Sequence, residues 1–240
     1  MNMWALGDYP RLAREVVGGL GPRLVAACGV RAGQRVLDVG TGSGLAALAA
    51  AEVGASVVGA DITPELLDAA RSSGAPVEWV FGDAQKLPFS DAEFDVVLSC
   101  VGAMFAPDQR ATADELVRVC RPGGVVGMVN WTPGGSIGGF FEVFGGSPAL
   151  SWGDPDHVRS LFGDGVSAFT AVEERLAVSR FSSAEEYCAY YKANFGPVIA
   201  AFAEAEDPAA LDRRFLAYAA GEMRAGLGYD YLLVVARRAG

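Results

Sequence analysis

The sequence contains a single histidine and only four cysteines among its 240 residues. Cys28, Cys100, Cys120 and Cys188 are widely spaced and form no CxxC pair, so no zinc-ligand pattern is present. We therefore expect reduced, mostly buried thiols and no bound metal.

Long hydrophobic runs and basic clusters are also missing. No stretch approaches the roughly 20 apolar residues that span a membrane, and the first eight residues, MNMWALGD, lack the plan of a signal peptide. No run of Lys and Arg exceeds a pair, and the formal net charge is −10, whereas nucleic-acid binders concentrate positive charge on one face. We expect a cytoplasmic protein with no membrane span and no nucleic-acid partner.

Glycine, in contrast, is abundant, and three of the 31 glycines form the most informative motif. Residues 36–44 read VLDVGTGSG, an apolar run followed by glycines that alternate with hydroxyl residues, and an alanine-rich segment comes next. This order predicts a strand, a tight loop and a helix of a nucleotide-binding α/β fold, because glycine lets the backbone bend and approach a ligand. The dinucleotide fingerprint requires glycine where Leu45 stands, which disfavours a nicotinamide oxidoreductase.

Three acidic residues lie near the ends of predicted strands. Asp38 stands two residues before Gly40, where its carboxylate would repel a pyrophosphate but attract an ammonium or sulfonium group. Asp61 ends the next strand, a position from which a carboxylate accepts hydrogen bonds from ribose hydroxyls. Asp83 follows a third apolar run, where it could accept from an adenine amine. These acids predict contacts to a cationic tail, a ribose and a base.

Strands and helices alternate along the chain with short loops between them, which predicts an α/β fold with a Rossmann-like, doubly wound sheet. We expect this sheet to be mostly parallel, with an antiparallel last strand. Residues 1–131 would form N-terminal helices and the nucleotide-binding core, and residues 132–240 the last strands of the same sheet with helical cap insertions, in a single domain overall. The predicted strands are 35–39, 56–60, 77–81, 94–99, 125–131, 169–181 and 231–236. The predicted helices are two short ones within 9–28, then 45–53, one from 63, 108–120, one closed by 163, one after 182 and 208–224.

Five motifs in this order resemble the class I S-adenosylmethionine-dependent methyltransferases, and within them the ubiquinone and menaquinone biosynthesis branch. They are VLDVGTGSG at 36–44, Asp61, GDAQKLPF at 82–89, FDVV at 94–97 and RPGG at 121–124. The resemblance implies S-adenosylmethionine as cofactor, with Asp61 at the ribose and with Ile62 and Asp83 at the adenine. The complete set of implied cofactor-binding residues is Asp38, Gly40, Thr41, Gly42, Ser43, Asp61, Ile62, Asp83, Ala84 and Cys100.

The methyl acceptor is expected to be a small, hydrophobic molecule. Met104, Phe105, Trp131 and Phe140 follow predicted strands at the ligand edge, and we expect them to shape an apolar acceptor site. The leading hypothesis is therefore an enzyme that methylates such a molecule at oxygen, nitrogen or carbon. The alternative is a non-catalytic or regulatory module that binds S-adenosylmethionine.

No strong general base is evident in the sequence. Methyl transfer from a sulfonium requires mainly alignment and a dry pocket. His157, Tyr190 and Tyr191 are the candidate catalytic side chains, although a lone histidine is more often structural. Adjacent tyrosines on a helix point about 100° apart, so we expect at most one of the two to face the pocket.

Overall fold

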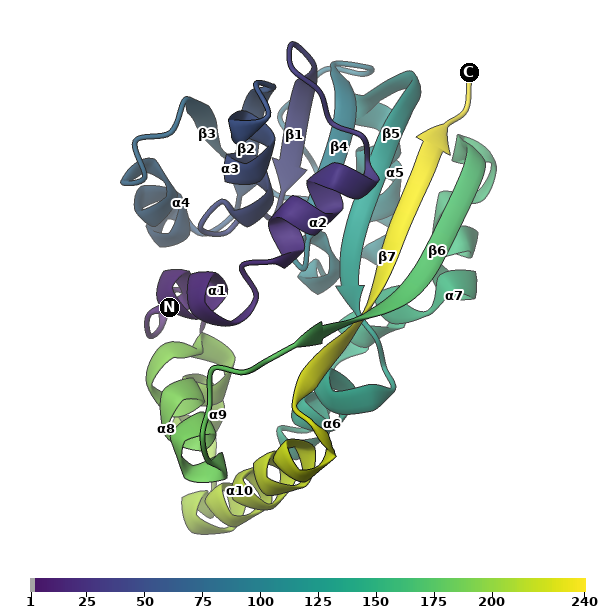
Figure 1. Ribbon diagram of the computed structural model, residues 1–240. Coiled ribbons are helices and arrows are strands. Elements are labelled where there is room, and N and C mark those ends of the chain that lie inside the picture. The colour runs from purple at the N-terminus through teal and green to yellow at the C-terminus, as the bar shows by residue number, and fades with distance from the viewer. Residues whose placement is uncertain (1–2) are drawn as a thin grey trace.

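The computed structural model describes residues 3–240, which are organised around one large sheet (Figure 1). Its strands are β1 (Arg35–Val39), β2 (Ser56–Asp61), β3 (Val77–Phe81), β4 (Phe94–Cys100), β5 (Cys120–Trp131), β6 (Val166–Ala177) and β7 (Gly228–Arg238). The seven strands are arranged in the order β3-β2-β1-β4-β5-β7-β6. Strands β3 to β5 are parallel, and β7 is antiparallel to both β5 and β6. The Rossmann-like fold with an antiparallel last strand is thus confirmed.

Helices flank both faces of this sheet. The α-helices are α1 (Tyr9–Val16), α2 (Leu20–Ala27), α3 (Leu45–Glu52), α4 (Pro64–Arg71), α5 (Gln109–Val119), α6 (Gly135–Val143), α7 (Pro155–Phe162), α8 (Ala184–Asn194), α9 (Gly196–Glu204) and α10 (Pro208–Ala225). Short 3-10 turns are η1 (Met3–Ala5), η2 (Ala103–Phe105), η3 (Pro148–Gly153) and η4 (Gly163–Gly165). In Figure 1, α2 and α3 lie in front of the sheet, while α5 and α7 lie behind it.

The central strands form because their residues are apolar, frequently β-branched and buried on both faces of the sheet. In β1, Val36, Leu37 and Val39 are almost fully buried, and they are paired with β2 on one side and β4 on the other. Such strands place the loops that follow them at one edge of the sheet, where ligands bind in open α/β folds. The glycine loop after β1 is therefore at this edge.

Local signals account for the ends of several helices. The side chain of Ser183 accepts a hydrogen bond from the Glu186 backbone N–H at 3.2 Å, which caps the start of α8. Asp8 caps α1 in the same way through the Arg11 N–H at 3.0 Å. These caps fix the starts of two helices that lie close to the ligand-binding edge.

In the second half of the chain, the bounds of one predicted strand are wrong and two helices were not predicted. The strand predicted at 169–181 is found at Val166–Ala177, because its partner β7 begins at Gly228, opposite Ala177. Helices α6 and α9 were not predicted, because glycines and a proline in these segments favour turns. Helix α6 forms where Phe140 packs against neighbouring aromatic rings.

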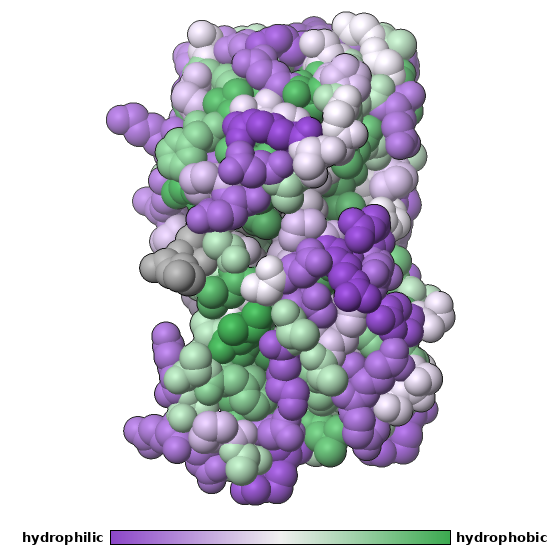
Figure 2. Space-filling model, turned by 90° about the vertical axis from the view of Figure 1, so that its left-hand side faces the viewer, coloured by the Kyte–Doolittle hydropathy of each residue, from purple (hydrophilic) through white to green (hydrophobic). Residues whose placement is uncertain are grey.

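Five helices lie beyond the carboxyl ends of the parallel strands. Helices α1, α6, α8, α9 and α10 gather there and cover the ligand-binding edge (Figure 1). From the side where α1 lies, hydrophobic side chains reach the surface at mid-height, between hydrophilic areas (Figure 2). Within residues 3–240, none of the helices combines the length and the apolar character needed to cross a membrane.

Candidate functional site

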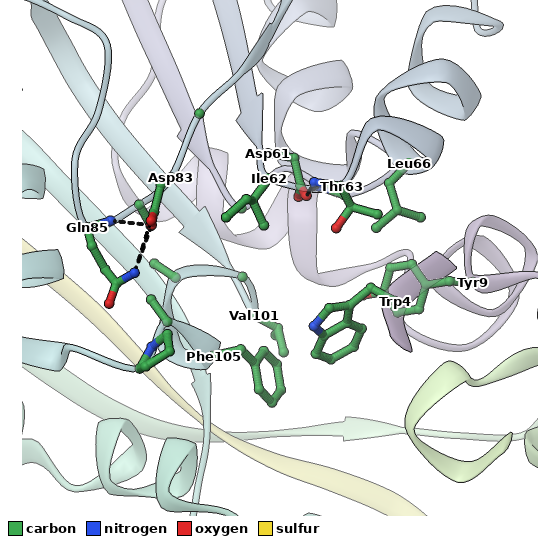
Figure 3. A pocket seen from close by; sticks show the side chains of 18 residues that line it. Trp4, Tyr9, Asp61, Ile62, Thr63, Leu66, Asp83, Gln85, Val101 and Phe105 are labelled. Carbon is green, nitrogen blue, oxygen red and sulfur yellow. Dashed lines mark hydrogen bonds between the residues drawn. The ribbon is translucent and has the colours of Figure 1, made fainter. Parts of the chain in front are cut away.

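A cleft opens at the carboxyl ends of β1, β2, β3 and β4, beside the glycine loop (Figure 3). We call it the glycine-loop cleft; its lining includes Gly40, Gly42, Asp61, Ile62, Asp83 and Ala84, which are six of the ten residues implied as cofactor contacts. The backbone of Gly40 has a positive φ of +65°, a conformation that favours glycine. The remaining four residues, Asp38, Thr41, Ser43 and Cys100, are not part of this lining.

Asp61 lines the glycine-loop cleft at the end of β2. Its two carboxylate oxygens accept backbone hydrogen bonds, one from Gly42 N–H at 2.8 Å and one from Thr63 N–H at 2.8 Å. Burial raises the pKa of this carboxyl, and the backbone hydrogen bonds oppose the rise. The side chain thus links the glycine loop to the end of β2 and still lines the cleft, with lone pairs left for hydroxyl donors.

Asp38 lies beneath the glycine loop and is only 1% exposed. Its Oδ2 accepts hydrogen bonds from the Thr41 hydroxyl at 2.6 Å and from the Ala47 backbone N–H at 3.0 Å. Its Oδ1 is buried and has no hydrogen-bond partner within the described chain. Burial raises the pKa of Asp38 to about 7. This oxygen is therefore a buried hydrogen-bond acceptor that is left unsatisfied.

The far end of the cleft is formed by Ile62, Asp83 and Gln85. Ile62 is 49% exposed, which is unusual for isoleucine, and its side chain lies on the cleft wall (Figure 3). The Asp83 carboxylate accepts from the Gln85 backbone N–H at 2.9 Å and from its side-chain amide at 3.0 Å. An apolar surface and an oriented carboxylate thus lie on the same cleft, the combination that a purine ring with an amino group would use.

Two aromatic residues from the N-terminal segment complete the cleft and were missed by sequence reasoning. Trp4 of η1 and Tyr9 of α1 line it opposite Ile62 (Figure 3). The Trp4 ring lies 4.8 Å from the ring of Phe105, centroid to centroid. Burial, together with the negative charge of Asp61, raises the pKa of the Tyr9 phenol, so it stays protonated at neutral pH. No spacing in the sequence links residues 4 and 9 to the glycine loop; only the tertiary packing does.

A second cavity, which we call the aromatic chamber, adjoins the glycine-loop cleft. Trp4, Tyr9, Val101 and Phe105 line both cavities, so the two share a common boundary. Nine of the fifteen residues that line the chamber are aromatic. A molecule in the chamber would therefore lie next to a molecule in the cleft, surrounded mostly by rings.

The structure brings three of the four predicted acceptor-site residues to this chamber. Phe105, Trp131 and Phe140 line it, and Cys100, which was implied as a cofactor contact, lines it too. Met104 does not, because it is 1% exposed and packs in the hydrophobic core.

The three catalytic candidates do not share one cavity. Tyr191 lines the aromatic chamber, whereas Tyr190 points away and its hydroxyl donates to Glu15 at 3.0 Å. The different directions of the Tyr190 and Tyr191 side chains follow the angle of about 100° expected between neighbours on a helix. The Nε2 atom of His157 lies 2.7 Å from Oε1 of Gln109, where it joins α7 to α5, and His157 lines neither cavity. The histidine therefore has a structural position in this fold.

Comparison with known proteins agrees with this arrangement. A family described as methyltransferase domain matches residues 37–128, the segment from the glycine loop to β5. An uncharacterized protein of Mycobacterium tuberculosis strain H37Rv is 43% identical over 98% of this chain and 93% of its own length. Residues 37–128 are therefore similar to methyltransferase domains, and the chain as a whole is related to the mycobacterial protein.

Two further proteins are similar over a shorter length or in fold alone. Demethylmenaquinone methyltransferase of Clavibacter sepedonicus is 42% identical over 39% of this chain and 39% of its own length. The crystal structure of the YcgJ protein of Bacillus subtilis superposes with a TM-score of 0.63 and 20% identity, covering 92% of this chain and 99% of that protein. At 20% identity, the likeness to the YcgJ protein shows the Rossmann-like fold alone.

Proposed function

We propose that this protein transfers the methyl group of S-adenosylmethionine to a small, hydrophobic acceptor. The observation that carries the proposal is the pairing of Asp61 with Ile62 on one cleft wall. A carboxylate for ribose hydroxyls and an exposed apolar side chain for a base follow one another at the end of β2. This order fits a nucleoside that lies across the strand ends.

The residues present fit the cofactor at its cationic end as well. The unpaired Oδ1 of Asp38, beneath the glycine loop, is a buried acceptor that an ammonium group of the methionine part would satisfy through water. Gly40 and Gly42 would admit the same part close to the backbone, and Asp83 with Ala84 would hold the adenine edge. When bound, S-adenosylmethionine supplies a methyl group that is already activated as a sulfonium.

The protein's own contribution to transfer is alignment and exclusion of water. Trp4, Tyr9 and Phe105 stand at the boundary of the two cavities, where they would separate the reacting groups from solvent. The 96-residue match to the demethylmenaquinone enzyme is too short to include both Gly40 and Tyr191. The hydrophobic character of the acceptor is therefore inferred from the aromatic chamber and not from that enzyme's substrate.

Calorimetry with S-adenosylhomocysteine and with NADH tests the cofactor. We expect S-adenosylhomocysteine to bind and NADH not to bind; the opposite result would support an oxidoreductase instead. Transfer is then tested with S-adenosylmethionine labelled on the methyl group. Methylated product should carry label into the organic extract of a metabolite mixture, while unreacted S-adenosylmethionine keeps the remaining label in the aqueous phase.

A non-catalytic binding module is the second candidate. It is favoured by one observation: among the described residues that line the aromatic chamber there is no carboxylate and no imidazole to act as a base. Binding of S-adenosylhomocysteine without transfer to any fraction of the mixture would support this module over the enzyme.

A further inference from the structure

The aromatic chamber lacks formal charge. Within the described part of the chain, its lining contains no Asp, Glu, Lys, Arg or His side chain. Transfer of an unpaired carboxylate from water into such surroundings is strongly unfavourable. The chamber therefore discriminates against an anionic molecule before any specific contact is made.

Three tyrosine hydroxyls form a hydrogen-bonded chain, and two of these tyrosines line the chamber. The hydroxyl oxygens of Tyr191 and Tyr229, both lining residues, lie 2.6 Å apart, and the Tyr229 hydroxyl donates to Tyr187 at 3.3 Å. A phenol has only one hydrogen to donate. Since Tyr229 directs its hydrogen to Tyr187, Tyr191 is the donor to Tyr229, and the oxygen lone pairs of Tyr191 remain as acceptors.

These hydroxyls stay neutral in the working range of pH. Burial raises the pKa of Tyr229 to about 12 and raises the pKa of Tyr191 well above its ordinary value. The chain therefore presents a neutral hydrogen-bond acceptor rather than a phenolate or a base. The adjacent Tyr190 provides a natural contrast, because its hydroxyl is bonded to Glu15 and it lines neither cavity.

We propose that the aromatic chamber selects a ring-bearing acceptor without negative charge, which donates one hydrogen bond, through a hydroxyl or an N–H group, to the Tyr191 hydroxyl. This inference rests on the proposed function, since it names the acceptor class of that site. Flat rings suit the chamber because offset and edge-to-face contacts with its aromatic side chains are favourable. Molecules whose recognised part carries a carboxylate or phosphate are excluded.

Three naphthalene probes of nearly equal ring size separate these requirements. 2-Naphthol is neutral and donates a hydrogen bond, 2-methoxynaphthalene is neutral without a donor, and 2-naphthoate is charged at neutral pH. Equilibrium dialysis against protein saturated with S-adenosylhomocysteine measures the Kd of each probe. We expect 2-naphthol to bind about 5-fold more tightly than 2-methoxynaphthalene and at least about 10-fold more tightly than 2-naphthoate.

Matched variants then locate the selecting group. In Tyr191→Phe the preference for 2-naphthol over 2-methoxynaphthalene should disappear while both still bind, because the ring is kept and the hydroxyl is lost. Tyr190→Phe removes the neighbouring hydroxyl outside the chamber and should preserve the preference. Tyr229→Phe provides a second test of the same hydroxyl pair if Tyr191→Phe is poorly folded. It should reduce the preference, because the Tyr191 hydrogen that it frees can be donated to the ether oxygen of 2-methoxynaphthalene.

The cofactor measurement distinguishes the two levels of failure. If S-adenosylhomocysteine does not bind, the proposed function fails and the acceptor class falls with it. If it binds but 2-naphthoate binds as tightly as 2-naphthol, or none of the probes binds, the acceptor class alone is wrong. Persistence of the donor preference in both Tyr191→Phe and Tyr229→Phe would equally overturn the assignment.

Discussion

Gly40 and Gly102 pass each other so closely that neither position can accommodate a side chain. A Cβ added to Gly40 would lie 2.7 Å from the Cα of Gly102, and a Cβ on Gly102 would overlap the Gly40 carbonyl oxygen. The contact joins the loop after β1 to the turn that follows β4, and both glycines line the glycine-loop cleft. The loop after β1 and the turn after β4 therefore line the cleft with two backbone segments in direct contact.

Gly40→Ala should lower the free energy of unfolding by at least about 2 kcal/mol, from left-handed backbone strain and from the clash with Gly102. Gly74→Ala is the matched control, because Gly74 has a similar φ of +69° but no atom within 4 Å of an added Cβ. That variant should lose only about 1 kcal/mol. Urea unfolding measures both, and equal losses would show that strain alone, without the close approach, accounts for the glycine.

The raised pKa of Asp38 predicts a distinct pH dependence of stability. Its carboxyl has a pKa of about 7 in the folded protein against an ordinary value of 3.8, so between these values the folded state holds a proton that the unfolded state has lost. The contribution of Asp38 to stability is fully present below pH 4 and is lost as pH rises towards 7, by up to about 1.4 kcal/mol per unit. Asp38→Asn removes the titrating group.

Urea unfolding of the unliganded protein and of Asp38→Asn from pH 4 to pH 8 isolates this contribution. The difference in unfolding free energy should change steadily up to about pH 7 and then level off. A difference that stays constant across the range would mean that Asp38 is ionised throughout. Other titrating groups are common to both proteins and cancel in the comparison.

The sheet and the acids of the cleft could be predicted because the determining signals are local. Apolar runs ending in Asp61, and glycines beginning at Gly40, specify a strand, its end and a tight loop without reference to the rest of the chain. Parallel topology then places the strand ends together. Asp38 was expected at the ligand itself, but the structure places it below the loop, because the Thr41 hydroxyl and the Ala47 N–H hold its carboxylate there.

The aromatic half of the site could not be predicted in the same way. Trp4 reaches the cleft by packing against Phe105 and Phe195, which are 101 and 191 positions away in the sequence. Helix α6 contains two adjacent glycines and forms only because Phe140 inserts among rings from α8 and α10. Contacts of this range depend on the complete fold, and no local periodicity encodes them.

Asp61→Ala should affect both ligand binding and the glycine loop. Loss of charge-assisted hydrogen bonds to the ribose should weaken S-adenosylhomocysteine binding by about 1–3 kcal/mol. The backbone N–H groups of Gly42 and Thr63 also lose their acceptor, which should lower the unfolding free energy by about 1–2 kcal/mol. Calorimetry and urea unfolding measure the two effects. Asp68→Ala is the control, because it removes an exposed carboxylate of α4 that pairs with Arg71. This variant should change neither the binding free energy nor the unfolding free energy by more than about 0.5 kcal/mol. Unchanged affinity in Asp61→Ala would reject the ribose contact.

Ile62→Ala separates a binding role from a structural one, because this side chain is half exposed and already lies on the cleft wall. We expect the unfolding free energy to change by less than about 0.5 kcal/mol, since little buried surface is lost in the unliganded protein. Affinity for S-adenosylhomocysteine should fall by about 1 kcal/mol, roughly 5-fold, through lost apolar contact with the base. Phe81→Ala is the control, because Phe81 is 61% exposed on β3 but does not line the cleft. If both variants bind S-adenosylhomocysteine with the affinity of the unmodified protein, the adenine does not contact Ile62.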